Sequence, residues 1–190
     1  MKKELLRVGF TFDTLDCMNC QPRSPQQGEL VKVVSDFLSS DCRLLTVLGM
    51  QGRGKSWGVA MGVQPYVLRY EEEIGNAFDK YQYLTHYELD LSYKSCMNPS
   101  SRITQVDCYK HFTEKPVLII DEFLKGAKTP YALDFVENVI NKRHAMKRKT
   151  ILITNHTTKE LATMLDPTIM DRLGNGNTGQ MFVLTGESLR

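Results

Sequence analysis

The sequence predicts an α/β fold of three layers, in which helices cover both faces of a mostly parallel, five-stranded sheet. Three short apolar runs predict it, at residues 44–48, 117–120 and 151–154. Each run is rich in leucine or β-branched side chains and ends in glycine or polar residues. Strands that a parallel sheet buries on both faces have this pattern. Two weaker runs, at residues 82–85 and 181–184, complete the predicted sheet.

The composition suits a single domain. The chain has 190 residues, and 42% of them are hydrophobic, which is enough for one buried core. We expect residues 1–28 to be an N-terminal lead-in segment or linker and residues 29–190 to form the core.

Charge and cysteine content restrict the class of protein. The 24 Lys and Arg residues nearly balance 22 Asp and Glu residues, so only a local basic patch could bind nucleic acid. The sequence contains no apolar run of about 18 residues, the length that would predict a membrane span, and no signal peptide is visible. Five cysteines, an odd number, favour a reducing compartment, so we expect a cytoplasmic protein.

A glycine-rich loop follows the first apolar run and has the spacing G-x-x-x-x-G-K-S. Its glycines allow a tight turn that points backbone N–H groups at phosphate oxygens, and a helix after Lys55 adds its positive end. A chance glycine-rich turn would not need a strand before it and helix-compatible residues after it. Lys55 is expected to reach the β- and γ-phosphates, and Ser56 to ligate Mg²⁺. The loop residues expected to bind the nucleotide are Gly49, Met50, Gln51, Gly52, Arg53, Gly54, Lys55, Ser56 and Trp57.

Polar residues follow two of the other buried runs. Asp121 and Glu122 come after residues 117–120, and Asn155 comes after residues 151–154. Open α/β sheets bind ligands at the carboxyl ends of their strands. Asp121 is therefore expected to hold Mg²⁺, Glu122 to polarise the water that attacks the γ-phosphate, and Asn155 to orient that water.

The remaining segments are expected to be helices and loops. Apolar spacing predicts helices at residues 28–40 and 131–148, and short helices at 161–165 and from Pro167. The helix after the glycine-rich loop is expected to end near Pro65, and residues 66–70 fit either a short strand or a continuation of that helix.

Four further features are not assigned by the sequence alone. Cys17 and Cys20 fit two free thiols better than a zinc site, since no second ligand pair is visible. The basic end of helix 131–148 is explained equally well by the helix dipole or by a bound nucleic acid or neighbouring nucleotide. Residues 10–15 can lie across a nucleotide base or along the sheet edge, and residues 95–104 form a loop that can face a partner.

The order of these motifs resembles the ATPase core of bacterial and phage replicative helicase loaders, the DnaC/DnaI-like branch of AAA+ proteins, which also includes the transposition ATPase IstB. The resemblance covers roughly residues 8–190. Within it, residues 49–56 correspond to Walker A, 117–122 to Walker B and 150–156 to the sensor-1 strand, with Asn155 as the sensor. Residues 171–173 resemble the box of the arginine finger, which implies that Arg172 reaches the γ-phosphate of an adjacent subunit.

Two further segments belong to the resemblance. Residues 186–190 resemble the closing G-E-S-x-R of this branch, which implies a sensor-2-like contact from Arg190. Residues 141–143 resemble its interface segment. The chain departs from full-length loaders in that we expect no separate N-terminal helicase-binding domain and no helical lid.

The resemblance implies a P-loop NTPase of the ASCE/AAA+ type that binds ATP and Mg²⁺ and hydrolyses ATP weakly as a monomer. It implies action as a homo-oligomer or filament on single-stranded DNA, with a replicative DNA helicase as the partner. Two alternatives are an IstB-like transposition ATPase and a nucleotide-gated adaptor with little turnover. A small-molecule kinase is disfavoured, because the acidic pair suits water as the acceptor.

Overall fold

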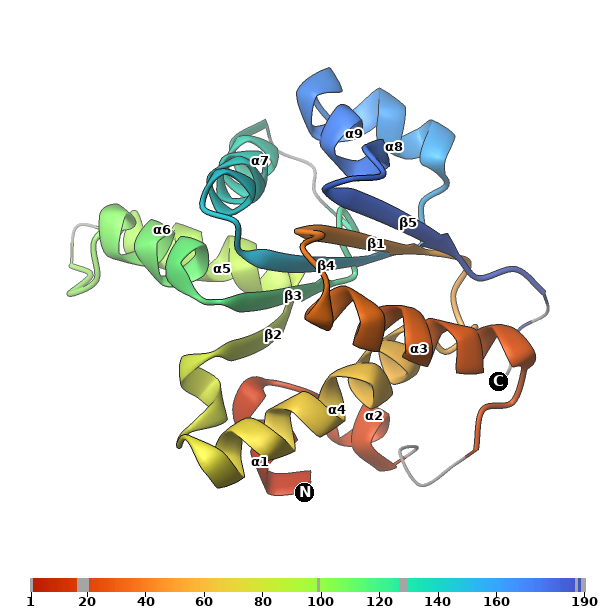
Figure 1. The fold of residues 1–190 in the computed structure, drawn as a ribbon. Coiled ribbons are helices and arrows are strands. Elements are labelled where there is room, and N and C mark those ends of the chain that lie inside the picture. The colour runs from red at the N-terminus through yellow and green to blue at the C-terminus, as the bar shows by residue number, and fades with distance from the viewer. Residues whose placement is uncertain (1, 17–20, 99, 127–129, 187, 189–190) are drawn as a thin grey trace.

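A computed structural model describes residues 2–16, 21–98, 100–126, 130–186 and 188. Its centre is a sheet of five strands in the order β2-β3-β4-β1-β5, and every pairing is parallel (Figure 1). The predicted α/β fold is confirmed, and each strand lies within three residues of its expected position. The strands are β1 (Leu44–Leu48), β2 (Tyr81–Thr85), β3 (Val117–Asp121), β4 (Lys149–Thr154) and β5 (Gly179–Val183).

Helices cover both faces of the sheet (Figure 1). One face carries α1 (Lys2–Val8), α2 (Phe12–Asp16), α3 (Pro25–Ser39) and α4 (Lys55–Glu73). The other carries α5 (His86–Cys96), α6 (Gln105–Glu114), α7 (Pro130–Ala145), α8 (Thr158–Met164) and α9 (Pro167–Gly174). A short 3-10 helix, η2 (Ala77–Asp79), precedes β2.

Side-chain alternation along each strand builds two cores. On β1, Leu45 and Val47 join the core beneath α3 and α4, while Leu44 and Leu48 join the core beneath α5 to α9. Both sets are at most 2% exposed. This two-sided burial is what the uninterrupted apolar runs predict, and it leaves the strand ends to carry the polar groups.

Helix α4 continues through Pro65 to Glu73, so the predicted end near Pro65 is wrong, and residues 66–70 are helical rather than a strand. Tertiary packing outweighs the hydrogen bond that proline removes. Gly58 and Gly62 let α3 come so close that an added Cβ would lie 2.5 and 2.6 Å from Leu30 and Val34 side-chain atoms. Val63 and Val67, on either side of Pro65, are fully buried.

The first residues of the chain pack into the same core as α3 and α4. Leu5, Val8, Phe10 and Leu15 are at most 2% exposed. Gly9 has a φ of +113°, and a Cβ there would lie 2.1 Å from the carbonyl oxygen of Tyr83. Helix α1 therefore lies against β2 and α4, and α2 lies against α4.

Arg143, near the end of α7, is buried and serves the fold. Its guanidinium donates to Thr150 Oγ1 at 2.9 Å and to the backbone carbonyls of Phe112, Lys115 and Lys149 at 2.5 to 2.7 Å. The expectation that residues 141–143 form an interface is wrong for Arg143, because its side chain is buried and its donors bond to acceptors inside the domain.

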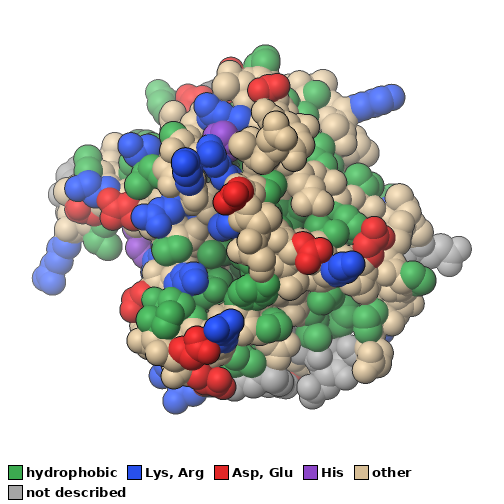
Figure 2. Space-filling model, viewed as in Figure 1, with side chains coloured by type: hydrophobic (Ala, Val, Ile, Leu, Met, Phe, Trp, Pro, Cys, Tyr) green, Lys and Arg blue, Asp and Glu red, His purple; other side chains and the backbone are tan. Residues whose placement is uncertain are grey.

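The other basic residues near this helix end have mixed roles. Figure 2 shows Lys and Arg side chains gathered over the end of α7 and the start of β4. Lys149 donates to the carbonyls of Phe37 and Cys42, at 2.7 and 2.6 Å, and so caps the end of α3. Lys142 and Lys147 remain exposed.

Candidate functional site

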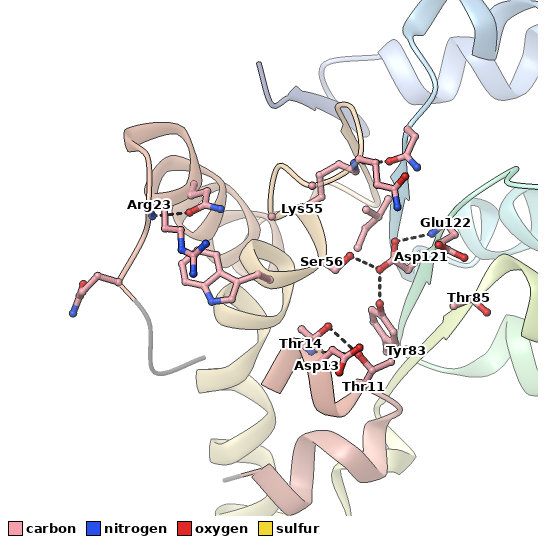
Figure 3. A pocket seen from close by; sticks show the side chains of 18 residues that line it. Thr11, Asp13, Thr14, Arg23, Lys55, Ser56, Tyr83, Thr85, Asp121 and Glu122 are labelled. Carbon is pink, nitrogen blue, oxygen red and sulfur yellow. Dashed lines mark hydrogen bonds between the residues drawn. The ribbon is translucent and has the colours of Figure 1, made fainter. Parts of the chain in front are cut away.

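A cavity of about 530 Å³ opens at the carboxyl ends of the strands, between the loop after β1 and the N-terminal helix α2 (Figure 3). Nine of the residues expected at the site line it: Gln51, Gly52, Gly54, Lys55, Ser56, Trp57, Asp121, Glu122 and Asn155. These nine residues come from the loop before α4, the start of α4, and the ends of β3 and β4.

The loop between β1 and α4 is shaped by its glycines and by a side chain of α3. Gly54 precedes α4 with a φ of +79°, and a Cβ there would lie 2.1 Å from Gln27 Nε2. Gln27 is 5% exposed, accepts from the Arg23 N–H at 2.7 Å and donates to the Arg53 carbonyl at 3.3 Å. Gln27 thus fixes the loop from outside, and nothing in the loop sequence indicates it.

Lys55 lies at the start of α4 with 7% of its surface exposed. Its ammonium donates to the Gly49 carbonyl at 2.5 Å, the Met50 carbonyl at 3.0 Å and Asn155 Oδ1 at 2.7 Å. Burial lowers the pKa of Lys55 to about 8, against a smaller opposing effect of Asp121. An anion in this cavity would regain the electrostatic stabilisation that the buried ammonium has lost.

Asp121, at the end of β3, gathers three donors. Ser56 donates to its Oδ2 at 2.5 Å, and the hydroxyl of Tyr83 donates to the same oxygen (Figure 3). Oδ1 accepts from the Glu122 N–H at 2.6 Å. Burial raises the pKa of Tyr83, and the Asp121 charge adds to that rise, so the hydroxyl stays protonated and donates.

The donors present fit a magnesium ion. A serine hydroxyl and a carboxylate in contact are hard oxygen ligands, and Mg²⁺ is commonly held by one or two protein oxygens together with substrate phosphates and water. Among the residues that the structure describes, no cluster of three or more His, Cys, Asp or Glu offers a site built from protein ligands alone.

Glu122 follows Asp121 in a left-handed conformation, with a φ of +51°, and Leu124 has a φ of +65°. Two hydrogen bonds anchor this turn to β4: Phe123 N–H to the Ile153 carbonyl at 2.7 Å, and Thr154 Oγ1 to the Phe123 carbonyl at 2.9 Å. The Glu122 carboxylate is 42% exposed and pairs with Lys125. The turn is fixed, while among the described residues the carboxylate is held by a solvent-exposed ion pair.

Several expected site residues do not line the cavity. Arg53 donates to the Leu184 carbonyl at 2.8 Å, and Met50 is 65% exposed. Arg172, on α9, donates to Asn141 Oδ1 on α7 and is absent from the cavity wall of its own chain. Gly49, the first residue of the loop, packs against Leu184, whose carbonyl oxygen would lie 2.7 Å from an added Cβ. Arg190, Cys17 and Cys20 lie outside the described residues.

Several residues of the cavity wall were not expected at a site. Tyr83 and Thr85 come from β2, Gln27 from α3 and Arg23 from the segment before it. The strand order gives a signal for two of them: β2 pairs with β3 so that Thr85 lies opposite Asp121. The segment at residues 10–15 borders the cavity, which is one of the two places predicted for it.

These features define the class of the fold: an α/β P-loop NTPase-like fold with its glycine-rich loop after β1. No protein-family model and no curated protein matches the sequence. The structure of the DnaC helicase loader aligns with a TM-score of 0.69 and 17% identity, over 88% of this chain and 94% of that one. The structure of DnaI aligns with a TM-score of 0.68 and 13% identity, over 95% and 94%.

AMPPCP-bound DnaA from Aquifex aeolicus has the same fold, with a TM-score of 0.63 and 12% identity. That alignment covers 84% of this chain, which spans 45% of the DnaA structure. At sequence identities this low, the structural alignments show a shared fold alone. No helix in the described part of the chain is long and apolar enough to cross a membrane.

Proposed function

We propose that this chain is a AAA+ ATPase of DNA replication that binds and hydrolyses ATP and loads or remodels a replicative helicase in the cytoplasm. In this proposal residues 29–190 are the ATPase core and residues 1–28 lead into it. The observation that carries the proposal is the contact of Ser56 with Asp121, 2.5 Å apart, beside Lys55 in a cavity that can hold a nucleotide.

Binding is assigned to the loop and to Lys55. Backbone N–H groups of residues 49–56 and the start of α4 would hold the phosphates. Lys55 would exchange its contact with Asn155 for phosphate oxygens. Ser56 and Asp121 are the residues that would hold Mg²⁺, which neutralises charge on the β- and γ-phosphate oxygens.

Hydrolysis is assigned to groups at the ends of β3 and β4. Glu122 would accept hydrogen bonding from the attacking water, and Asn155 would orient that water. The Glu122 carboxylate is paired with Lys125, so it must leave this exposed pair before it can act. Arg172 is assigned to the γ-phosphate of a neighbouring subunit, and Arg190 to a sensor contact, which makes the assembled oligomer the active form.

A nucleotide-gated adaptor with little turnover is a second candidate. The Glu122–Lys125 pair favours it, because the ion pair engages the carboxylate that hydrolysis would need as general base. The deciding experiment measures ATP affinity and phosphate release for the wild type, Lys55→Ala and Glu122→Gln, with and without single-stranded DNA. We expect Lys55→Ala to lose binding and Glu122→Gln to bind but not turn over. Binding without phosphate release by the wild type would select the adaptor, and normal turnover by Glu122→Gln would refute its role as base.

The fold shared with DnaC and DnaI, the first of which is a helicase loader, supports a replicative helicase as the proposed partner. An IstB-like transposition ATPase has the same core and would differ in its partner. A pulldown with the host's replicative helicase, with and without ATP and followed by sizing of the complex, separates these functions. Recovery of a transposase rather than the helicase, with this chain as the bait, would select the IstB-like function.

A further inference from the structure

Tyr83 connects the N-terminal segment to the candidate metal site. It lies on β2 and is 6% exposed, and its hydroxyl donates to Asp121 Oδ2, the oxygen that also accepts from Ser56. Figure 3 shows the hydroxyl pointing at the Asp121 carboxylate from the side opposite the loop. No step of the proposed hydrolysis uses this side chain.

The three donors to Asp121 differ in how firmly they are held. Ser56 belongs to the first turn of α4, beside the loop that must accommodate a nucleotide, and its hydroxyl is needed as a ligand itself. Tyr83 and the Glu122 N–H belong to β2 and to the turn after β3, which the sheet fixes. When Ser56 turns towards a metal ion, these two donors are the ones that continue to orient the carboxylate.

The N-terminal segment packs against Tyr83. The Phe10 ring lies 4.4 Å away, centroid to centroid, with an angle of 30° between the planes. Gly9 brings the backbone of the N-terminal segment against the Tyr83 carbonyl, a position that a side chain would block. The Phe10 ring and the backbone of the N-terminal segment thus fix the position of the Tyr83 ring, from which its hydroxyl donates to Asp121.

We infer that Tyr83 is a positioning residue, whose hydroxyl fixes the Asp121 carboxylate for the divalent ion of a bound nucleotide. This inference rests on the proposed binding of ATP with Mg²⁺. It goes beyond that binding, because it makes the affinity for the ion depend on β2 and on the segment packed against it. A tyrosine that only satisfies its own buried hydroxyl would leave the affinity for the ion unchanged.

The test compares Tyr83→Phe with Tyr81→Phe. Tyr81 lies two residues earlier on the same strand, is 2% exposed and contacts the Tyr70 ring rather than a carboxylate. For each variant, binding of a non-hydrolysable ATP analogue is measured in EDTA and across a Mg²⁺ titration. Loss of one hydrogen bond to the charged carboxylate should raise the Mg²⁺ concentration at the midpoint roughly three- to tenfold in Tyr83→Phe. The affinity for the analogue in EDTA should not change. Tyr81→Phe should match the wild type in both.

A double-mutant cycle that combines Tyr83→Phe with Asp121→Asn keeps the test informative if Tyr83→Phe also lowers the stability of the fold. Adding Tyr83→Phe to Asp121→Asn should cause no further loss of Mg²⁺ dependence, since the contact is already altered. An unchanged Mg²⁺ midpoint in Tyr83→Phe, or equal losses in both backgrounds, would overturn the inference. A wild type that binds no nucleotide in either condition would instead overturn the proposed function.

Discussion

Lys55 and Asn155, one hundred residues apart in the sequence, are joined by a hydrogen bond of 2.7 Å from the ammonium to Oδ1. The contact ties the start of α4 to the residue that follows β4. It also means that the lysine is already saturated with acceptors, because the carbonyls of Gly49 and Met50 lie within 3.0 Å. A nucleotide must therefore displace an existing contact.

We predict that Asn155→Ala separates binding from turnover. The two carbonyls still hold Lys55, so nucleotide affinity should change by less than about threefold, whereas loss of the group that orients water should reduce turnover about tenfold or more. Equilibrium binding and single-turnover hydrolysis measure the two effects. His156→Ala, at the next position, is the matched control, and a normal turnover rate in Asn155→Ala would remove it from the mechanism.

Arg143→Met should be among the most destabilising substitutions in this chain. The change leaves the carbonyls of Phe112, Lys115 and Lys149 without their donor inside the protein, which should cost about 3–5 kcal/mol of unfolding free energy. Urea unfolding, with the slope checked for constancy, measures this. Lys142→Ala, exposed on the same helix, should stay within about 0.5 kcal/mol of the wild type. Equal stabilities would show that the buried guanidinium is dispensable.

Local spacing was enough to predict the sheet and the central part of the site. The glycine-rich loop, Asp121 and Asn155 each follow an apolar run, so their position at one sheet edge follows from a parallel arrangement. Tyr83 and Gln27 could not be predicted in this way, because their roles depend on which strand and helix lie beside the loop. Two tertiary effects also reversed local expectations: packing against α3 carries α4 through Pro65, and burial turns Arg143 into a structural residue.

Acidification should destabilise the fold through His86. This side chain is 2% exposed, lies against the Phe123 ring, and neither ring nitrogen has a hydrogen-bond partner among the described residues. Burial lowers the pKa of His86 below 6.5, and Asp90 only partly opposes this effect. The unfolded chain therefore takes up the proton at a higher pH than the folded chain, and unfolding becomes more favourable as pH falls below 6.5.

His86→Leu should remove this part of the pH dependence. Between pH 6.5 and the lowered pKa, the wild type should lose up to about 1.4 kcal/mol of unfolding free energy per pH unit from this group, and the variant should have a flatter curve. Urea midpoints from pH 8 to pH 5 measure both curves. At pH 8, where the histidine is neutral in both states, the difference between the proteins isolates the effect on packing. Parallel curves for the two proteins would contradict the assignment.

Arg172 gives the most direct test of a shared active site. Its guanidinium contacts Asn141 and lies away from the cavity of its own chain, so any contact with a γ-phosphate must come from a neighbouring copy. Arg172→Ala and Lys55→Ala should each hydrolyse little ATP alone, the first for lack of a finger and the second for lack of bound nucleotide. Mixed in equal amounts, they should recover about a quarter of wild-type turnover, because random assembly pairs an intact Lys55 with a neighbour's Arg172 at one site in four.

Wild-type activity per subunit should also rise with protein concentration or added single-stranded DNA. Flat specific activity and no recovery on mixing would show that each chain works alone, and Arg172 would then have to act through Asn141 on the fold of its own subunit.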